Sequence, residues 1–241
     1  KFVLNNLRDG DLFNIIAYDS QLEAFRPELQ KHDDTTRKRA LGFVEGLYAG
    51  GGTNIDGALR MALGMLQDRS RPSYIIFLTD GLPTVGETNE GKILDAVKAG
   101  NAVRARLLAF GVGYDVNSRL LDRLTRDNFG RSEFVRANED IELYVSRLYQ
   151  KVSSPVMTDV AVRFEFDAVP VEQGEPVNRL YPRQVGDLFE GEQLVLVGRY
   201  KKSGLAKVKI TGRVAGQERK FDFPASLVES SADQSSAFVE K

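Results

Sequence analysis

A run of β-branched and aromatic residues, 74–81, restricts the fold of this chain more than any other segment, and it ends in Thr79, Asp80 and Gly81. A short apolar run of this kind is typical of a strand buried inside a parallel sheet. Open α/β sheets bind their ligands at the carboxyl ends of such strands. We therefore expect the carboxylate of Asp80 to lie at a binding edge.

A second motif precedes this strand. Three glycines, 50–52, come directly before Thr53 and Asn54. Glycines let a loop approach its neighbours closely, so this loop can bring the Thr53 hydroxyl to the same edge. A hydroxyl and a carboxylate are hard oxygen donors, which suit a Mg²⁺ ion that keeps several of its waters. The sequence predicts that Thr53 and Asp80 are metal ligands.

The apolar residues around these motifs predict strands that alternate with helices, which is typical of a doubly wound, mostly parallel sheet. Strands are expected at 12–18, 74–80, 106–112 and 132–135. Helices are expected at 35–48 and around the apolar sets Ile55, Leu59, Ala62, Leu63 and Leu66; Ile93, Leu94 and Val97; Leu120, Leu121 and Leu124; and Ile141, Val145 and Leu148.

These residues and their spacing resemble a von Willebrand factor type A (VWA) domain, and within that family the inter-alpha-trypsin inhibitor heavy chains and their bacterial relatives. The family's metal ion-dependent adhesion site combines a D-x-S-x-S loop after the first strand, a Thr in a later Gly-rich loop and an Asp at the end of a central strand. The resemblance implies that Thr53 and Asp80 are the second and third parts. It also implies a Mg²⁺ or Mn²⁺ ion that engages an acidic side chain of a protein partner.

The first part of that site does not match this chain, which opens with a short helical stripe of Phe2, Val3 and Leu7 and no N-cap signal. We expect the first strand and its D-x-S-x-S loop to lie outside these residues, which leaves weak or no specific metal binding here. A missing central strand would expose unpaired backbone groups. The gap is filled by a strand outside the sequence, by a changed strand order, or by a strand donated in self-association.

Near Ser153 and Ser154 the apolar period changes from 3.6 to 2, which indicates a second, all-β domain. Strands are predicted at 159–166, 194–200 and 206–210, with a hairpin around 214–217. We predict a VWA-like domain over 1–152, a small β-sandwich over 153–229, and a tail over 230–241 that begins a truncated helix or is disordered. Segment 180–191 also resembles the region after the VWA domain in the heavy-chain family.

Each candidate residue has a structural alternative. Asp80 with Gly81 is also typical of a strand-end turn, and Thr53 is a suitable helix N-cap. His32, the single histidine, lies in a polar stretch and is expected in a solvated loop. The leading function is an adhesion module, not an enzyme. The alternatives are a structural scaffold with a degenerate site and a metal-assisted hydrolase, for which no general base is found.

Composition limits the kinds of binding partner that can be proposed. A formal net charge of -1 gives no reason to propose nucleic acid or an anionic membrane. The sequence has no cysteine, which excludes a disulfide framework, and no apolar run of membrane-spanning length. The compartment stays open, with an extracellular, periplasmic or membrane-anchored location suspected for the longer protein.

Overall fold

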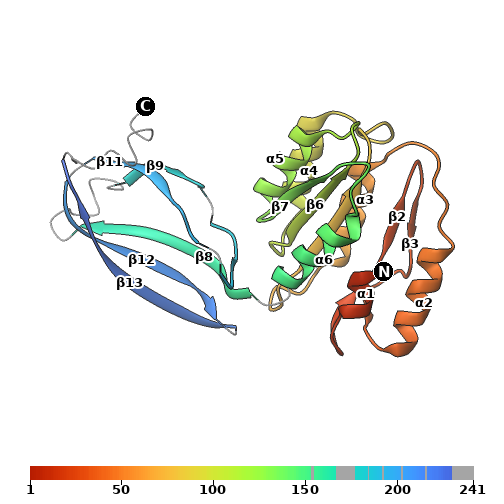
Figure 1. Ribbon diagram of the computed structural model, residues 1–241, viewed down its shortest axis with the longest axis horizontal. Coiled ribbons are helices and arrows are strands. Elements are labelled where there is room, and N and C mark those ends of the chain that lie inside the picture. The colour runs from red at the N-terminus through yellow and green to blue at the C-terminus, as the bar shows by residue number, and fades with distance from the viewer. Residues whose placement is uncertain are drawn as a thin grey trace. The chain divides into compact units, whose positions relative to one another are not determined.

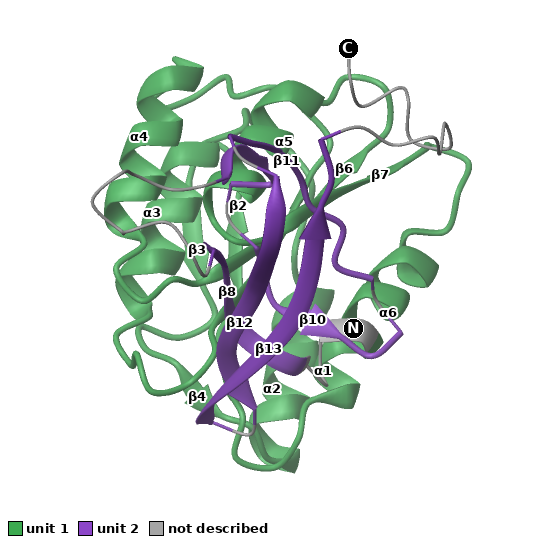
Figure 2. Ribbon diagram, turned by 90° about the vertical axis from the view of Figure 1, so that its left-hand side faces the viewer, with its two compact units in different colours: residues 1–150 green, residues 151–241 purple. Residues whose placement is uncertain are grey.

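The computed structural model describes residues 1–152, 155–166, 177–183, 185–191, 193–201, 203–214 and 216–229. The chain divides into two compact units, Lys1–Gln150 and Lys151–Lys241, shown in different colours in Figure 2. The first unit combines helices with a parallel sheet, and the second is built of antiparallel strands. The predicted fold class is thus confirmed, whereas the predicted boundary at Ser153 and Ser154 and the tail at 230–241 lie outside the described residues.

The first unit is built around a parallel sheet of β5 (Tyr74–Thr79), β6 (Arg106–Val112) and β7 (Arg131–Val135), in the order β5-β6-β7. The helices that alternate with these strands are α3 (Ile55–Met65), α4 (Glu90–Gly100), α5 (Ser118–Asp127) and α6 (Ile141–Val152) (Figure 1). The apolar faces of α3, α4 and α5 pack with β5 and β6 into one core. Burial of these apolar faces holds the helices to the sheet.

The N-terminal part of this unit contains α1 (Phe2–Asn6), β1 (Leu12–Phe13), β2 (Ile16–Tyr18), β3 (Leu22–Ala24), β4 (Gln30–Lys31) and α2 (Asp34–Glu45). The single strand predicted over 12–18 is in fact β1 and β2, with Asn14 between them. The Asn14 side chain donates to the Arg26 carbonyl at 2.6 Å and accepts from the Ile15 amide at 2.9 Å. These side-chain bonds replace the strand ladder locally, so β1 pairs with β4 and β2 with β3.

β5 is less buried than its apolar sequence predicts. Within the described residues it lies at one edge of the parallel sheet, paired only with β6, and Leu78 is 42% exposed. The expectation of a fully buried strand is therefore wrong. Tyr18 from β2 covers part of this edge, because its ring stacks on Phe77 with 5.5 Å between centroids and its hydroxyl donates to the Leu78 carbonyl at 2.7 Å.

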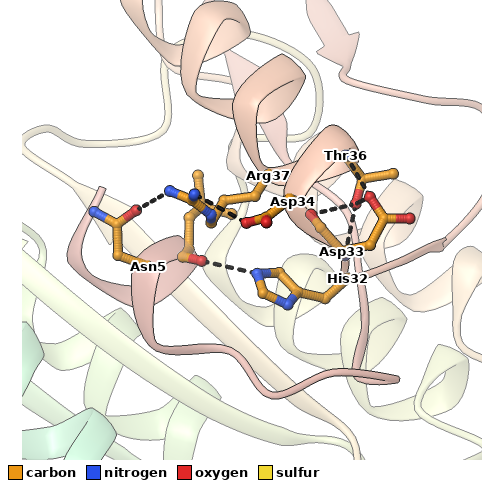
Figure 3. A network of polar contacts seen from close by, with 7 residues as sticks. Asn5, His32, Asp33, Asp34, Thr36 and Arg37 are labelled. Carbon is orange, nitrogen blue, oxygen red and sulfur yellow. Dashed lines mark hydrogen bonds and ion pairs between the residues drawn. The ribbon is translucent and has the colours of Figure 1, made fainter.

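His32 is buried, and the expectation of a solvated position is wrong. Its side chain is only 7% exposed and its Nε2 lies 3.2 Å from the Leu4 carbonyl of α1. Its ring meets Phe13 edge-on at 6.0 Å. The polar neighbours in the sequence serve a different purpose: Asp33 caps α2 through a capping box with Thr36 (Figure 3). His32 thus joins α1 to the small apolar cluster beneath α2.

The second unit consists of β8 (Pro155–Phe166), β9 (Val177–Tyr181), β10 (Leu188–Phe189), β11 (Val197–Tyr200), β12 (Gly204–Val214) and β13 (Gln217–Leu227). One sheet has the order β10-β8-β12-β13, and β9 pairs with β11 in another. The predicted hairpin is confirmed, since β12 and β13 pair without interruption from Val214 and Gln217 to Gly204 and Leu227 (Figure 1). Gly216 in its turn has a φ of 78°, which favours glycine.

Candidate functional site

The loop before α3 places Thr53 beside the end of β5. Asn54 is the N-cap of α3, and its side chain accepts from the Gly57 amide at 3.0 Å. The alternative in which Thr53 caps this helix is therefore wrong. A Cβ atom added to Gly81 would lie 3.4 Å from Thr53 Oγ1, so the hydroxyl faces the residue that follows Asp80.

A second loop, which follows β5, fixes the backbone of Thr53. The Thr53 amide donates to Thr84 Oγ1 at 2.8 Å, while its carbonyl accepts from the amides of Thr84 and Val85 at 3.0 and 3.3 Å. Gly52 lets the two loops touch, since a Cβ there would lie 2.5 Å from Val85 Cγ2. The predicted close approach of the glycine loop thus has a definite partner, the 84–85 segment.

Asp80 leaves the end of β5 with its side chain exposed to solvent. Its carboxylate makes no hydrogen bond or ion pair within the part of the chain that the structure describes. The strand-end turn is instead spanned by Thr79, whose Oγ1 is 3.5 Å from the Gly81 amide, a long and weak contact. The Asp80 carboxylate is therefore available for a ligand.

The turn between β2 and β3 also belongs to this region, which sequence reasoning missed. Ser20 Oγ accepts from the Gly52 amide at 2.7 Å, and the Asp19 carbonyl accepts from the Asn54 amide at 3.0 Å. A Cβ on Gly51, whose φ is 76°, would lie 3.0 Å from Asp19 Oδ2. A polar Asp-Ser pair between two strand-like segments signals a turn, but nothing local signals its contact with the glycine loop.

The donors at this edge match part of a metal site. Thr53 and Asp80 supply a hydroxyl and a carboxylate that are not used by the described protein, and both are oxygen donors of the kind that Mg²⁺ prefers. Within the described ranges, no three His, Cys, Asp or Glu side chains gather so as to hold a metal ion. These residues therefore fit an ion held by few protein ligands, and they need additional ligands for tight binding.

Tyr18 lies beside Asp80, and burial raises the pKa of its hydroxyl to about 12, an increase to which the negative charge of Asp80 also contributes. The folded protein therefore holds this proton between pH 10, the ordinary value, and about 12, while the unfolded chain releases it. We expect unfolding to become easier as the pH rises through this window, by about 2 to 3 kcal/mol in total, with no effect below pH 10.

Denaturant unfolding at several alkaline pH values, with absorbance near 295 nm to follow tyrosine ionisation, measures this effect. The Tyr18→Phe variant is the control. It should lose the latest phase of tyrosine ionisation and the corresponding slope of stability against pH. An unchanged slope in this variant would contradict the assignment to Tyr18.

The parallel sheet, the loop that carries Thr53 and the position of Asp80 together define a von Willebrand factor type A domain. A profile of the von Willebrand factor type A domain family matches residues 1–134, and the chain belongs to this family. It is similar to the inter-alpha-trypsin inhibitor heavy chain H4 of Homo sapiens, with 33% identity over 96% of this chain and 25% of that protein. The corresponding protein of Mus musculus is 30% identical over 94% of this chain and 24% of its own length.

A solved structure shares the fold. The von Willebrand factor type A protein from Catenulispora acidiphila superposes with a TM-score of 0.66 at 18% identity, covering 94% of this chain and 60% of that chain. The chain spans about a quarter of the length of the curated heavy chains that it matches. The resemblance stated from the sequence is thus confirmed for the family, while the metal-binding roles of Thr53 and Asp80 stay predictions.

Proposed function

We propose that this chain is the core of a protein-binding module, not an enzyme, in which Thr53 and Asp80 help to hold a Mg²⁺ or Mn²⁺ ion that engages an acidic side chain of a partner. One observation carries the proposal: the Thr53 hydroxyl faces Gly81, next to the exposed Asp80, at the carboxyl end of β5, and neither side chain has a hydrogen-bond or ion-pair partner among the described residues. Membership of the VWA family supports it.

The chemistry suits adhesion. A divalent ion beside a single carboxylate keeps net positive charge and an exchangeable position, which an acidic side chain can occupy. The protein's part is to position its donors. Thr84 and Val85 hold the Thr53 backbone, and the Thr53 hydroxyl faces Gly81. Asp80 faces solvent, where a partner has access to it.

We propose that the remaining ligands come from a D-x-S-x-S segment outside these 241 residues, and that its strand pairs with β5. The described residues leave one edge of β5 without a strand, which supports this placement. A strand donated by another copy would serve the same edge in self-association. Either strand would displace the Tyr18 hydroxyl from the Leu78 carbonyl and would gain ladder hydrogen bonds along this edge.

The cellular setting follows from the same proposal. An adhesion module acts where it meets other proteins, and we propose an extracellular, periplasmic or membrane-anchored location for the longer protein. No helix in the part of the chain described by the structure is long and apolar enough to cross a membrane.

Calorimetric titration of the longer protein with Mg²⁺ and Mn²⁺ tests the site. We expect Asp80→Asn and Thr53→Ala to weaken metal affinity at least about tenfold and to reduce partner binding in parallel, because each removes an oxygen donor. The matched control is Asp115→Asn. Asp115 is exposed and follows β6 at the same edge, so its substitution removes the same charge without removing a proposed ligand.

Two results would count against the proposal. Partner binding that survives both substitutions would favour a structural scaffold with a degenerate site. Micromolar Mg²⁺ binding by the 241-residue chain alone would show that the proposed outside ligands are not needed.

A further inference from the structure

β13 is a long edge strand with an unusual surface. It runs for 11 residues, and the described residues provide a partner on one side only, β12. Gln217 to Pro224 are all exposed, and two of them are aromatic: Phe221 is 43% exposed and Phe223 is 50% exposed. A long exposed edge that carries apolar side chains is a template for pairing with another strand.

The two faces of this sheet differ strongly. Opposed residues of an antiparallel ladder share a face. Phe221 lies opposite Ile210 and Phe223 opposite Val208. On the next strand these rows continue to Val162 and Phe164 of β8. The alternate rows are polar, with Lys220 opposite Thr211 and Asp222 opposite Lys209. An added strand would therefore continue an apolar face on one side and a charged face on the other.

The backbone groups of β13 that point to the open edge can be assigned. Val214 and Gln217 flank a two-residue turn, so they form a hydrogen-bonded pair, and such pairs alternate along the ladder. Phe221 therefore directs its backbone groups to β12, whereas Lys220, Asp222 and Pro224 direct theirs outward. Pro224 fits this assignment, because a strand accommodates proline where the missing N–H would face an open edge.

We propose that β13 pairs in antiparallel fashion with β13 of a second copy of this chain, with Phe221 on the two-fold axis. In this register the outward backbone N–H and C=O groups of Lys220 form hydrogen bonds with those of Asp222 of the other copy. The two-fold axis repeats this pair on its other side. The two side chains lie on the charged face with opposite charge. The two Phe221 rings meet on the apolar face, as a non-hydrogen-bonded pair with Cβ atoms about 5 Å apart.

The charges of β13 disfavour the two neighbouring registers. Moving the axis by one residue places Lys220 opposite its own copy in one direction, or Asp222 opposite its own copy in the other. Directly opposed like charges destabilise a strand pair. Lys220 thus protects the edge against unregistered pairing and supports the one register in which it meets Asp222. The contact is isologous and occupies the open edge of both copies, so the assembly closes as a dimer.

Sedimentation of the 241-residue chain over a range of concentrations tests the dimer. We expect a reversible dimer of the 26.8 kDa chain. Lys220→Glu or Asp222→Lys should weaken it about tenfold or more, because each substitution opposes like charges twice. The double variant Lys220→Glu with Asp222→Lys restores opposite charges and should recover most of the affinity. A monomer at all concentrations would overturn the proposal and leave the edge to a different polypeptide.

Cysteine substitution tests the register, because the native sequence contains no cysteine. Phe221→Cys places two thiols on the axis, within the Cα separation that a disulfide needs, and should yield a covalent dimer under mild oxidation. Phe223→Cys is the matched control, since Phe223 is similarly exposed on the same face but would lie opposite Arg219. Equal crosslinking of the two variants, or a dimer unaffected by the charge substitutions, would overturn the β13 register.

Discussion

Gly130→Ala is expected to lower the free energy of unfolding by about 3 kcal/mol or more, although it adds only one methyl group. A Cβ atom at Gly130 would lie 1.8 Å from the backbone oxygen of Leu107. Leu107 belongs to β6, the middle strand of the parallel sheet, and is 2% exposed. Neither backbone can move without disturbing the pairing of β6 with β7, which starts at Leu108 and Arg131. The clash therefore acts on the centre of the fold.

Urea unfolding followed by far-ultraviolet circular dichroism measures this loss. Gly64→Ala is the matched control, because Gly64 lies in α3 with no atom within 4 Å of the added Cβ. Alanine favours a helix over glycine, so this control should gain about 0.5 to 1 kcal/mol. Similar unfolding midpoints for the two variants would contradict the role given to Gly130.

Asn101→Ala is expected to cost about 2 to 4 kcal/mol, because one side chain satisfies both backbone groups of a buried residue. Asn101 Oδ1 accepts from the Ala105 amide at 2.6 Å, and its Nδ2 donates to the Ala105 carbonyl at 2.8 Å. The same Nδ2 donates to Asn128 Oδ1 at 2.8 Å. Ala105 is 0% exposed and Asn128 is 1% exposed, so water cannot replace the lost bonds. Each buried polar group that is left without a hydrogen bond costs about 1 to 3 kcal/mol of stability.

Asn89→Ala provides the comparison for Asn101→Ala. Asn101 is the C-cap of α4, and Asn89 is the N-cap of the same helix. The Asn89 side chain accepts from the Lys92 amide at 3.1 Å. Asn89 is exposed, so water can solvate the freed amide and the expected cost is about 1 kcal/mol. Thermal or urea unfolding of both variants compares them directly. A loss for Asn101→Ala no larger than that for Asn89→Ala would refute the buried-network explanation.

Helices and strands that follow local rules could be predicted from the sequence. The start of α5 follows such a rule, because Asn117 directly precedes the helix and its side chain accepts from the Leu120 amide at 2.9 Å. The apolar run at 106–112 matches β6 residue for residue, because a central parallel strand is buried on both faces. In the second unit, the predicted strand at 206–210 and the turn around 214–217 were enough to predict the β12–β13 hairpin.

The rest depends on contacts that no local pattern encodes. Asn14 interrupts a strand-like run through bonds to Arg26, 12 residues away. His32 is buried by α1 and Phe13, although its own neighbours are polar. β5 has the sequence of a buried strand, yet its burial depends on how many strands flank it. Sequence patterns report the preference of a residue, while burial is decided by what packs against it.

The residues of the candidate site also include some that local motifs indicate and some that only long-range contacts reveal. Thr53 and Asp80 could be proposed as candidate ligands because their motifs lie next to a glycine loop and a strand end. Ser20 and Thr84 were not found, since they act through hydrogen bonds to Gly52 and Thr53 across 32 and 31 residues of sequence. Only the folded chain shows that three separate loops meet at this edge.

The anchoring of the glycine loop has a consequence for recognition. Ser20 and Asp19 hold its amides on one side, and Thr84 and Val85 hold Thr53 on the other. A ligand that binds at Thr53 therefore meets a donor whose backbone freedom was already lost during folding. Ordering a flexible loop would subtract from the binding free energy, whereas a preorganised loop leaves that free energy available for affinity. A triple glycine, which by itself suggests mobility, here serves close packing and rigidity.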